Sequence, residues 1–137
     1  IQHWQHVLDT NSIYTIYRMV KPTFTQSPYI KILINSCSIP IARFITTNNN
    51  LPINVLRFVN IDRNERLCTK CNRRDIGDEF HFLFICPFFH EKRREVLANK
   101  YTQRPNAITF ETLLNASDKK TLLKLKHFIC CINNALA

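Results

Sequence analysis

The spacing of apolar side chains predicts helices along most of the chain. Near its end, apolar residues recur every three or four positions among polar ones, which is the pattern of a helix with one buried face. We expect this helix to span about residues 119–136, with Ser117 and Asp118 as its N-terminal cap. Its predicted buried stripe consists of Leu122, Leu125, Ile129 and Ile132.

Proline marks the start of further predicted helices. Ser27-Pro28 has the form of a helix cap followed by proline in the first turn, and Ser38 with Pro40 repeats this form. Helices placed by this signal and by Pro87 and Pro105 are expected at about residues 29–34, 39–47, 87–101 and 105–115. Their inner faces are expected to carry Ile41, Phe44, Ile45, Val96, Leu97 and Tyr101.

Three shorter segments have weaker patterns. Residues 1–8 can form a short helix, and residues 13–20 fit a helix or a strand equally well. The segment at 53–58 is expected to bury Leu56 and Phe58.

Composition and charge narrow the choice of partners. The chain has 137 residues, the length of one domain, and a formal net charge of +9. Such an excess favours polyanions, of which nucleic acid is the commonest, although it also suits a plain solvated surface. No apolar run approaches the ~20 residues of a membrane span, and the start at Ile1 lacks the pattern of a signal peptide. We expect a fragment or processed piece that acts inside the cell, without a membrane or a small-molecule substrate.

Four residues in the middle of the chain have the spacing of a zinc site. They form the pattern Cys-x2-Cys-x9-His-x4-Cys, with Cys68, Cys71, His81 and Cys86 as the predicted ligands. Zn²⁺ prefers a tetrahedron of thiolate and imidazole ligands, and two residues between cysteines allow both sulfurs to reach one ion. Metal binding is favoured over disulfides because these cysteines lie with a histidine at ligand spacing.

Two alternatives concern the fourth ligand and the remaining cysteines. His90, which follows Cys86 after three residues, is a rival to His81, although it would have to fold back from the next helix. Cys130 and Cys131 are interpreted as core thiols.

Cys86 precedes Pro87, which disfavours the α conformation at Cys86 and suits a helix start. At a helix start the helix dipole favours a thiolate.

The interval between Cys71 and Cys86 contains a glycine and the start of an aromatic run. Gly77, the only glycine, is expected to provide a turn with positive φ, after which Asp78 and Glu79 begin a short helix carrying His81. The aromatic residues are interpreted as core, with base stacking as the alternative: Phe80, Phe82, Phe84, Phe88 and Phe89.

These patterns predict a mostly α, small helical domain organised around a Cys-Cys-His-Cys zinc knuckle. Residues 1–60 would form a helical scaffold, residues 61–104 the knuckle with the following basic helix, and residues 105–137 the C-terminal helices. Basic side chains are frequent in the middle section, where a rigid knuckle could hold them against phosphates. The predicted nucleic-acid contacts are Arg63, Arg66, Lys70, Arg73, Arg74, Lys92, Arg93 and Arg94.

The motifs of common enzymes are not found in the sequence. It contains no glycine-rich phosphate loop, no Gly-x-Ser-x-Gly elbow and no deaminase signature. A nuclease that uses Asp118 or Glu111 is a third alternative, behind a binding module and an interaction module. We expect that the chain itself is not an enzyme.

Residues 51–97 resemble the region downstream of the reverse transcriptase domain in non-LTR retrotransposon polyproteins of invertebrates. The resemblance is carried by Leu51-Pro52-Ile53, the Arg-x-x-Arg-x-Cys-x-x-Cys run from Arg63 to Cys71, Asp78 to His81, and Cys86-Pro87-Phe88. A weaker likeness includes Ile39 to Phe44, and the whole covers about residues 1–130.

The resemblance implies a zinc knuckle that binds the element's RNA or its target DNA during target-primed reverse transcription, in the nucleus. It carries the ligand role to Cys68, Cys71, His81 and Cys86. The polymerase would lie upstream, as a possible partner, because Tyr-x-Asp-Asp is absent here. Some relatives continue into a nuclease that begins at Pro-Asp, whereas this chain has Pro105-Asn106. The alternative function is a zinc-stabilised module that docks on a polymerase or host protein without touching nucleic acid.

Overall fold

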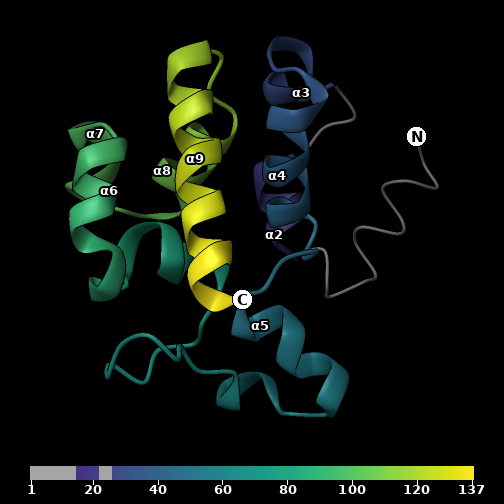
Figure 1. Ribbon diagram of the computed structural model, residues 1–137, viewed down its shortest axis with the longest axis vertical. Coiled ribbons are helices and arrows are strands. Elements are labelled where there is room, and N and C mark those ends of the chain that lie inside the picture. Colours follow the sequence, from purple (N-terminus) through teal and green to yellow (C-terminus); the bar gives the residue numbers. More distant parts are fainter. Residues whose placement is uncertain (1–14, 22–25) are drawn as a thin grey trace.

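The computed structural model describes residues 15–21 and 26–137, which form a mostly helical domain, as predicted (Figure 1). The helices are α2 (Thr15–Val20), α3 (Pro28–Ile32), α4 (Asn35–Ile45), α5 (Pro52–Val55), η2 (Leu56–Val59), η3 (Arg63–Glu65), η4 (His81–Ile85), η5 (Pro87–Phe89), α6 (His90–Val96), α7 (Asn99–Thr102), α8 (Ala107–Leu114) and α9 (Lys119–Leu136). Within these residues, β pairing is limited to an isolated antiparallel bridge between Leu67 and Ile76. The ambiguous segment at 13–20 is helical from Thr15, and the helix predicted at 1–8 lies outside the described residues.

Helix α9 is the centre of the fold, and its bounds agree with the prediction. Asp118 is its N-cap, with Oδ2 accepting a hydrogen bond from the backbone N–H of Thr121 at 2.9 Å. The predicted stripe is buried, together with Phe128: Leu122, Leu125, Ile129 and Ile132. Helix α9 packs against α4 on one side and α6 on the other, and the segment around α5 lies near its C-terminal end (Figure 1).

Helix α4 begins earlier than its proline suggests. The backbone N–H groups of Cys37 and Ser38 both donate to the carbonyl of Ile34 at 2.9 Å, so the helix is established before Pro40. The predicted start at residue 39 is therefore wrong, and Pro40 lies inside the helix, where it removes one backbone donor. The predicted inner face is confirmed, because Ile41, Phe44 and Ile45 are fully buried.

The helix predicted at 87–101 is divided into η5, α6 and α7. Its interruption is at Leu97, whose backbone is extended (φ −93°, ψ 142°) although its N–H still donates to the carbonyl of Arg93 at 2.8 Å. The predicted inner face is nevertheless correct, because Val96, Leu97 and Tyr101 are all buried. The interruption therefore divides the predicted helix but leaves the predicted side chains in the core.

The prediction that Leu56 and Phe58 are buried is wrong. Phe58 is 75% exposed and Leu56 is only half-buried, whereas Pro52, Ile53 and Asn54 are buried one turn earlier. At Leu56 the chain tightens from an α-helix into a 3-10 helix, which has fewer residues per turn and therefore rotates later side chains off the buried face.

Gly77 is required by a close contact, not by a turn. Its φ is not positive, and the left-handed residue in this loop is Arg74, with φ 63°. A β-carbon at Gly77 would lie 2.8 Å from Cγ of Pro52, so the backbone at position 77 touches the proline ring. The N–H of Ile53 donates to the carbonyl of Gly77 at 3.1 Å and fixes this approach.

Replacing Gly77 with alanine is expected to destabilise the protein by about 1–3 kcal/mol, because the added methyl group overpacks the contact with Pro52. Chemical denaturation of Gly77→Ala, alone and combined with Pro52→Ala, measures this. The cost of Gly77→Ala is expected to be smaller in the Pro52→Ala background, where the ring is gone. An equal cost in both backgrounds contradicts a contact with the ring.

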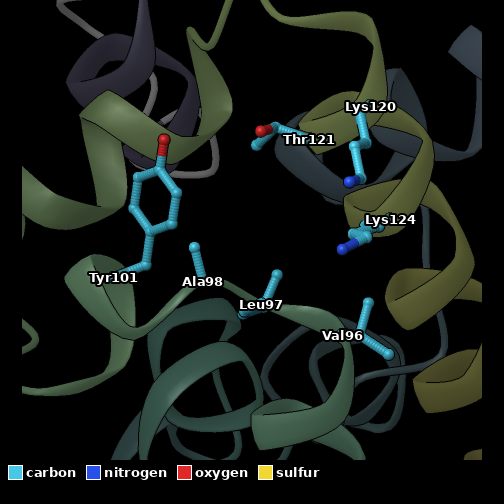
Figure 2. Close-up of a pocket in the computed structure, with 7 residues that line it drawn as sticks. All are labelled: Val96, Leu97, Ala98, Tyr101, Lys120, Thr121 and Lys124. Carbon is cyan, nitrogen blue, oxygen red and sulfur yellow. The ribbon is translucent and has the colours of Figure 1, made fainter.

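A cavity of about 210 Å³ lies between α9 and the α6–α7 connection. Tyr101 faces Lys120 and Lys124 across it, above a floor of apolar side chains (Figure 2). Among the described residues, the titratable groups that line the cavity are Tyr101, Lys120 and Lys124.

Candidate metal centre

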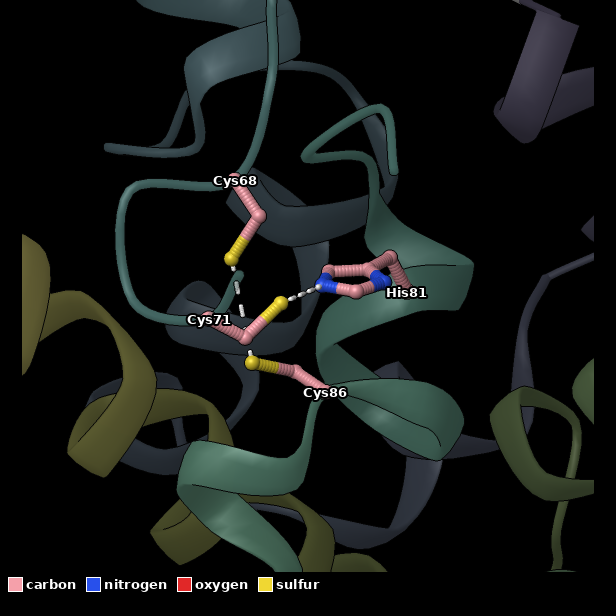
Figure 3. A group of neighbouring side chains, drawn as sticks. All are labelled: Cys68, Cys71, His81 and Cys86. Carbon is pink, nitrogen blue, oxygen red and sulfur yellow. Dashed lines mark hydrogen bonds between the residues drawn. The ribbon is translucent and has the colours of Figure 1, made fainter. Parts of the chain in front are cut away.

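Cys68 and Cys71 lie on a loop that is closed at its base. The bridge between Leu67 and Ile76 holds the two ends of this loop together, and the N–H of Cys68 donates to the carbonyl of Asp75 at 2.9 Å. These contacts fix both ends of the loop. The sulfurs of Cys68 and Cys71 both lie on the side of the loop that faces η4 (Figure 3).

His81 and Cys86 are brought together by a π-helical turn, η4. The turn begins where Oδ1 of Asp78 accepts the backbone N–H of His81 at 2.9 Å. It ends where the N–H of Cys86 donates to the carbonyl of His81 at 2.8 Å, a bond from residue i+5 to residue i. An α-helical turn closes on residue i+4 and would rotate Cys86 away from His81. The four residues between His81 and Cys86 in the sequence motif are therefore the number that one π-turn contains.

The structure brings the predicted ligands together. One ligand atom from each side chain lies within 4.8 Å of all the others in the group Cys68, Cys71, His81 and Cys86. Sγ of Cys68 is 3.7 Å from Sγ of Cys86, and Sγ of Cys71 is 3.5 Å from Nε2 of His81 (Figure 3). His90, the rival ligand, is exposed and does not belong to this group.

These distances fit the edges of a tetrahedral metal site. Metal–sulfur bonds of about 2.3 Å and metal–nitrogen bonds of about 2.0 Å give sulfur–sulfur edges of about 3.8 Å and sulfur–nitrogen edges of about 3.5 Å. A disulfide would require sulfur atoms about 2.05 Å apart, and all the cysteines of the described residues are free. The group therefore has the donors and the spacing of a Cys3His metal site.

Burial disfavours the thiolate form of two of these cysteines, so a nearby cation is needed to stabilise that form. Cys86 is fully buried, and burial raises the pKa of its thiol to about 12; burial also raises the pKa of Cys68. The N–H of Lys70 donates to Sγ of Cys68 at 3.3 Å and lowers the pKa of that thiol, and the backbone of Phe88 has the same effect on the pKa of Cys86. Burial is therefore the largest effect on the pKa of Cys86, and it opposes the thiolate that the helix start was predicted to favour. A bound metal ion would supply the charge that makes both groups thiolates.

The histidine presents one ring nitrogen to the cysteines and the other to an acid. Burial lowers the pKa of His81, against the opposing effect of Asp75 and Asp78, and this favours the neutral ring that ligates metals. Nε2 faces Cys71, so in the ligating tautomer the proton resides on Nδ1. Nδ1 is buried without a hydrogen-bond partner among the described residues, and Oδ2 of Asp75 lies 3.6 Å from it. This pairing resembles the outer carboxylate that orients many metal-binding histidines.

The prediction that Arg93 contacts nucleic acid is wrong. Arg93 is buried, with 3% of its surface exposed. Its Nε donates to the carbonyl of Leu83 at 2.6 Å. One terminal nitrogen donates to the carbonyls of Phe82 and Cys86, both at 3.0 Å. Burial lowers its pKa to about 10, so the guanidinium is still charged at neutral pH. Arg93 therefore braces the π-turn and Cys86, which follows it, and cannot reach a phosphate.

The other predicted basic residues lie at or near the surface. Those that are exposed are Arg63, Arg73, Arg74 and Arg94, and those that are half-buried are Arg66, Lys70 and Lys92. Arg66 donates to the carbonyls of Ile61 and Ile53 at 2.9 and 3.1 Å, which is a structural role. Arg73 donates to Oδ2 of Asp75 at 2.8 Å.

A buried polar contact that the sequence does not indicate joins α5 to the start of η4. Nδ2 of Asn54 donates to Oε1 of Glu79 at 3.0 Å and to Oδ1 of Asn49 at 2.7 Å. Glu79 is 2% exposed, and burial raises its pKa to about 7. The residues are 25 positions apart, so local patterns could not pair them.

Comparisons with protein-family models, with curated proteins and with solved structures find no match for this chain. None of the described helices has the length and apolar character needed to cross a membrane. A functional conclusion therefore has to come from the side chains of the site.

Proposed function

We propose that the chain binds one Zn²⁺ ion through Cys68, Cys71, His81 and Cys86 and that this ion is structural. Three sulfurs and one imidazole form a soft ligand set that suits Zn²⁺, and the sulfur–sulfur and sulfur–nitrogen edges fit its tetrahedron. Four protein ligands leave no open position for a water or a substrate. The ion would hold the loop from Cys68 to Asp75 against η4.

We propose that the domain so formed binds nucleic acid, as an accessory module of a retroelement reverse transcriptase. The observation that carries this proposal is the placement of exposed Arg73 and Arg74 on the loop of the metal centre, in a chain of net charge +9. Fixed cations of this kind contact phosphates and give salt-dependent affinity with little sequence information. The partners would be the element RNA or target DNA and the upstream polymerase, and the location would be nuclear.

Removing the two loop charges is expected to weaken the salt dependence of RNA and DNA binding. The test variant is Arg73→Gln with Arg74→Asn, because asparagine tolerates the positive φ at position 74. The slope of log affinity against log salt is expected to fall by roughly one for each phosphate that the variant no longer neutralises. Fluorescence anisotropy at several salt concentrations measures it.

A matched control removes the same charge from another surface. Lys31 and Arg43 are exposed on α3 and α4, and changing both to glutamine is expected to alter the slope less. Equal slopes in the wild type and the loop variant contradict a footprint on the metal loop.

A second candidate function, docking on a protein, is favoured by exposed apolar side chains around η2. Phe58 is 75% exposed and Val59 is 63% exposed, with Val55 and Ile61 nearby in the chain and also exposed. Exposed apolar patches often mark interaction sites. Absence of salt-sensitive nucleic-acid binding by the zinc-loaded protein would favour this candidate over the first.

A further inference from the structure

Phe88 differs from the aromatic residues that precede and follow it. Phe82, Phe84 and Phe89 are buried, whereas Phe88 is 57% exposed, directly after the ligand Cys86 and Pro87. Its ring packs edge-to-face on Phe89, with centroids 4.9 Å apart and an interplanar angle of 77°. The Lys70 ammonium group lies over the Phe88 ring, 5.3 Å from its centroid. An exposed ring and a cation that lies over one of its faces are thus found together near the surface.

The metal centre fixes both members of this pair. Lys70 lies between Cys68 and Cys71, and its N–H donates to Sγ of Cys68 at 3.3 Å. Phe88 follows the ligand Cys86 by two positions, and the N–H of Phe89 donates to the carbonyl of Cys86 at 3.3 Å. Each residue therefore lies within two positions of a ligand cysteine, and the two cysteines come from different segments. A single exposed phenylalanine is ordinary, but this one lies under a cation whose own backbone is bonded to a ligand sulfur, so the aromatic and cationic groups are already together.

We propose that Phe88 is a stacking platform for an unpaired nucleobase, with Lys70 placed for the adjoining phosphate, so that the ligand is single-stranded nucleic acid. This inference rests on the proposed nucleic-acid function and specifies its substrate class. Stacking of bases on aromatic rings beside cationic groups is how proteins hold single strands with little sequence preference. Phosphate contacts by Arg73 and Arg74, on the same loop as Lys70, would extend the contact along the strand.

The platform predicts discrimination between single strands and duplexes. Bases in a duplex stack on one another and do not offer a free face, so Phe88 could engage only an unpaired base. Affinity for a duplex would come from the basic side chains alone. RNA and DNA strands offer the same chemistry to a phenyl ring, and both are therefore needed in the test.

The first experiment compares Phe88→Leu with Phe58→Leu in the zinc-loaded full chain. Phe58 is the matched control, because it is 75% exposed and has its own cation, Arg57, 4.7 Å from the ring centroid. Phe88→Leu is expected to weaken binding to a single-stranded oligonucleotide roughly 5- to 150-fold, the effect of losing one base–aromatic stack. Duplex affinity, the salt slope and zinc content are expected to be unchanged, and Phe58→Leu is expected to bind like the wild type.

The second experiment detects the stack directly. Phe88→Trp is introduced into a Trp4→Phe background, so that position 88 carries the only tryptophan of the chain. Single-stranded RNA and DNA are expected to quench its fluorescence, and a hairpin without unpaired bases is expected not to.

The outcomes separate this inference from the function on which it rests. If the wild type binds neither single strands nor duplexes, the nucleic-acid function fails and the platform with it. If the wild type binds with a normal salt slope but Phe88→Leu binds single strands equally well, the platform is overturned and the function stands. An equal loss in Phe58→Leu also overturns the platform, because any exposed aromatic residue would then account for the effect.

Discussion

Replacing Cys86 with serine is expected to abolish tight zinc binding and to remove the cooperative unfolding transition at room temperature. Serine is nearly the same size as cysteine, but its hydroxyl does not ionise to a ligand as the thiol does. Structural zinc contributes about 10–16 kcal/mol in small zinc peptides, which equals or exceeds the whole stability of an ordinary domain, about 5–15 kcal/mol. Position 86 is fully buried, so the change also places an unpaired polar group in the core.

The measurement is a zinc titration of the purified variant, followed by thermal and chemical unfolding monitored by circular dichroism. Cys131→Ser is the matched control, because Cys131 is a half-buried cysteine on α9 outside the metal group. It is expected to bind one zinc ion with the affinity of the wild type. Wild-type zinc affinity in Cys86→Ser would contradict the ligand assignment.

Replacing Arg93 with methionine is expected to cost about 3–5 kcal/mol of stability, because it leaves buried carbonyls without their charged donor. Without the Arg93 guanidinium, three carbonyls lose their hydrogen-bond donor, those of Phe82, Leu83 and Cys86. Two of these carbonyls belong to the π-turn and lack their i+4 donors: the N–H of Cys86 donates to His81 and not to Phe82, and Pro87 has no N–H for Leu83. Zinc affinity is expected to fall as well, because the turn would no longer hold His81 and Cys86 in place.

Arg94→Met is the control for this prediction. Arg94 is the next residue on α6 and is exposed, so the same substitution there is expected to change stability by no more than about 0.5 kcal/mol. Arg93→Lys keeps the charge but cannot reach the carbonyls as a planar fork does, and it is expected to be intermediate. Urea denaturation of the zinc-loaded proteins measures all three. Equal stability of Arg93→Met and Arg94→Met would contradict a bracing role.

Local signals were sufficient for the features that depend on neighbouring residues. The stripe and the cap of α9 follow from periodicity and from one acidic residue before the helix. The four metal-site residues follow from their intervals, because two cysteines with two residues between them and a Cys-Pro pair constrain the backbone locally. Proline was a less reliable signal, since the backbone bonds to Ile34 start α4 before Pro40.

The features that the sequence could not indicate depend on distant partners. Arg93 lies in a run of charged residues typical of a solvated helix face, and its carbonyl partners lie 7 to 11 positions earlier in the chain. Gly77 is explained by Pro52, 25 positions earlier, and not by its own φ. Phe88 has the same side chain as Phe89, and only the packing of the folded chain decides which ring is exposed.

The central claim is that one zinc ion joins the loop at Cys68 to the turn at His81. X-ray absorption spectroscopy at the zinc edge, combined with elemental analysis of the purified protein, tests it most directly. We expect one zinc ion per chain, with a first shell of three sulfurs at about 2.3 Å and one nitrogen at about 2.0 Å. A fully folded protein without metal, or zinc whose first shell lacks the sulfurs, would contradict the account.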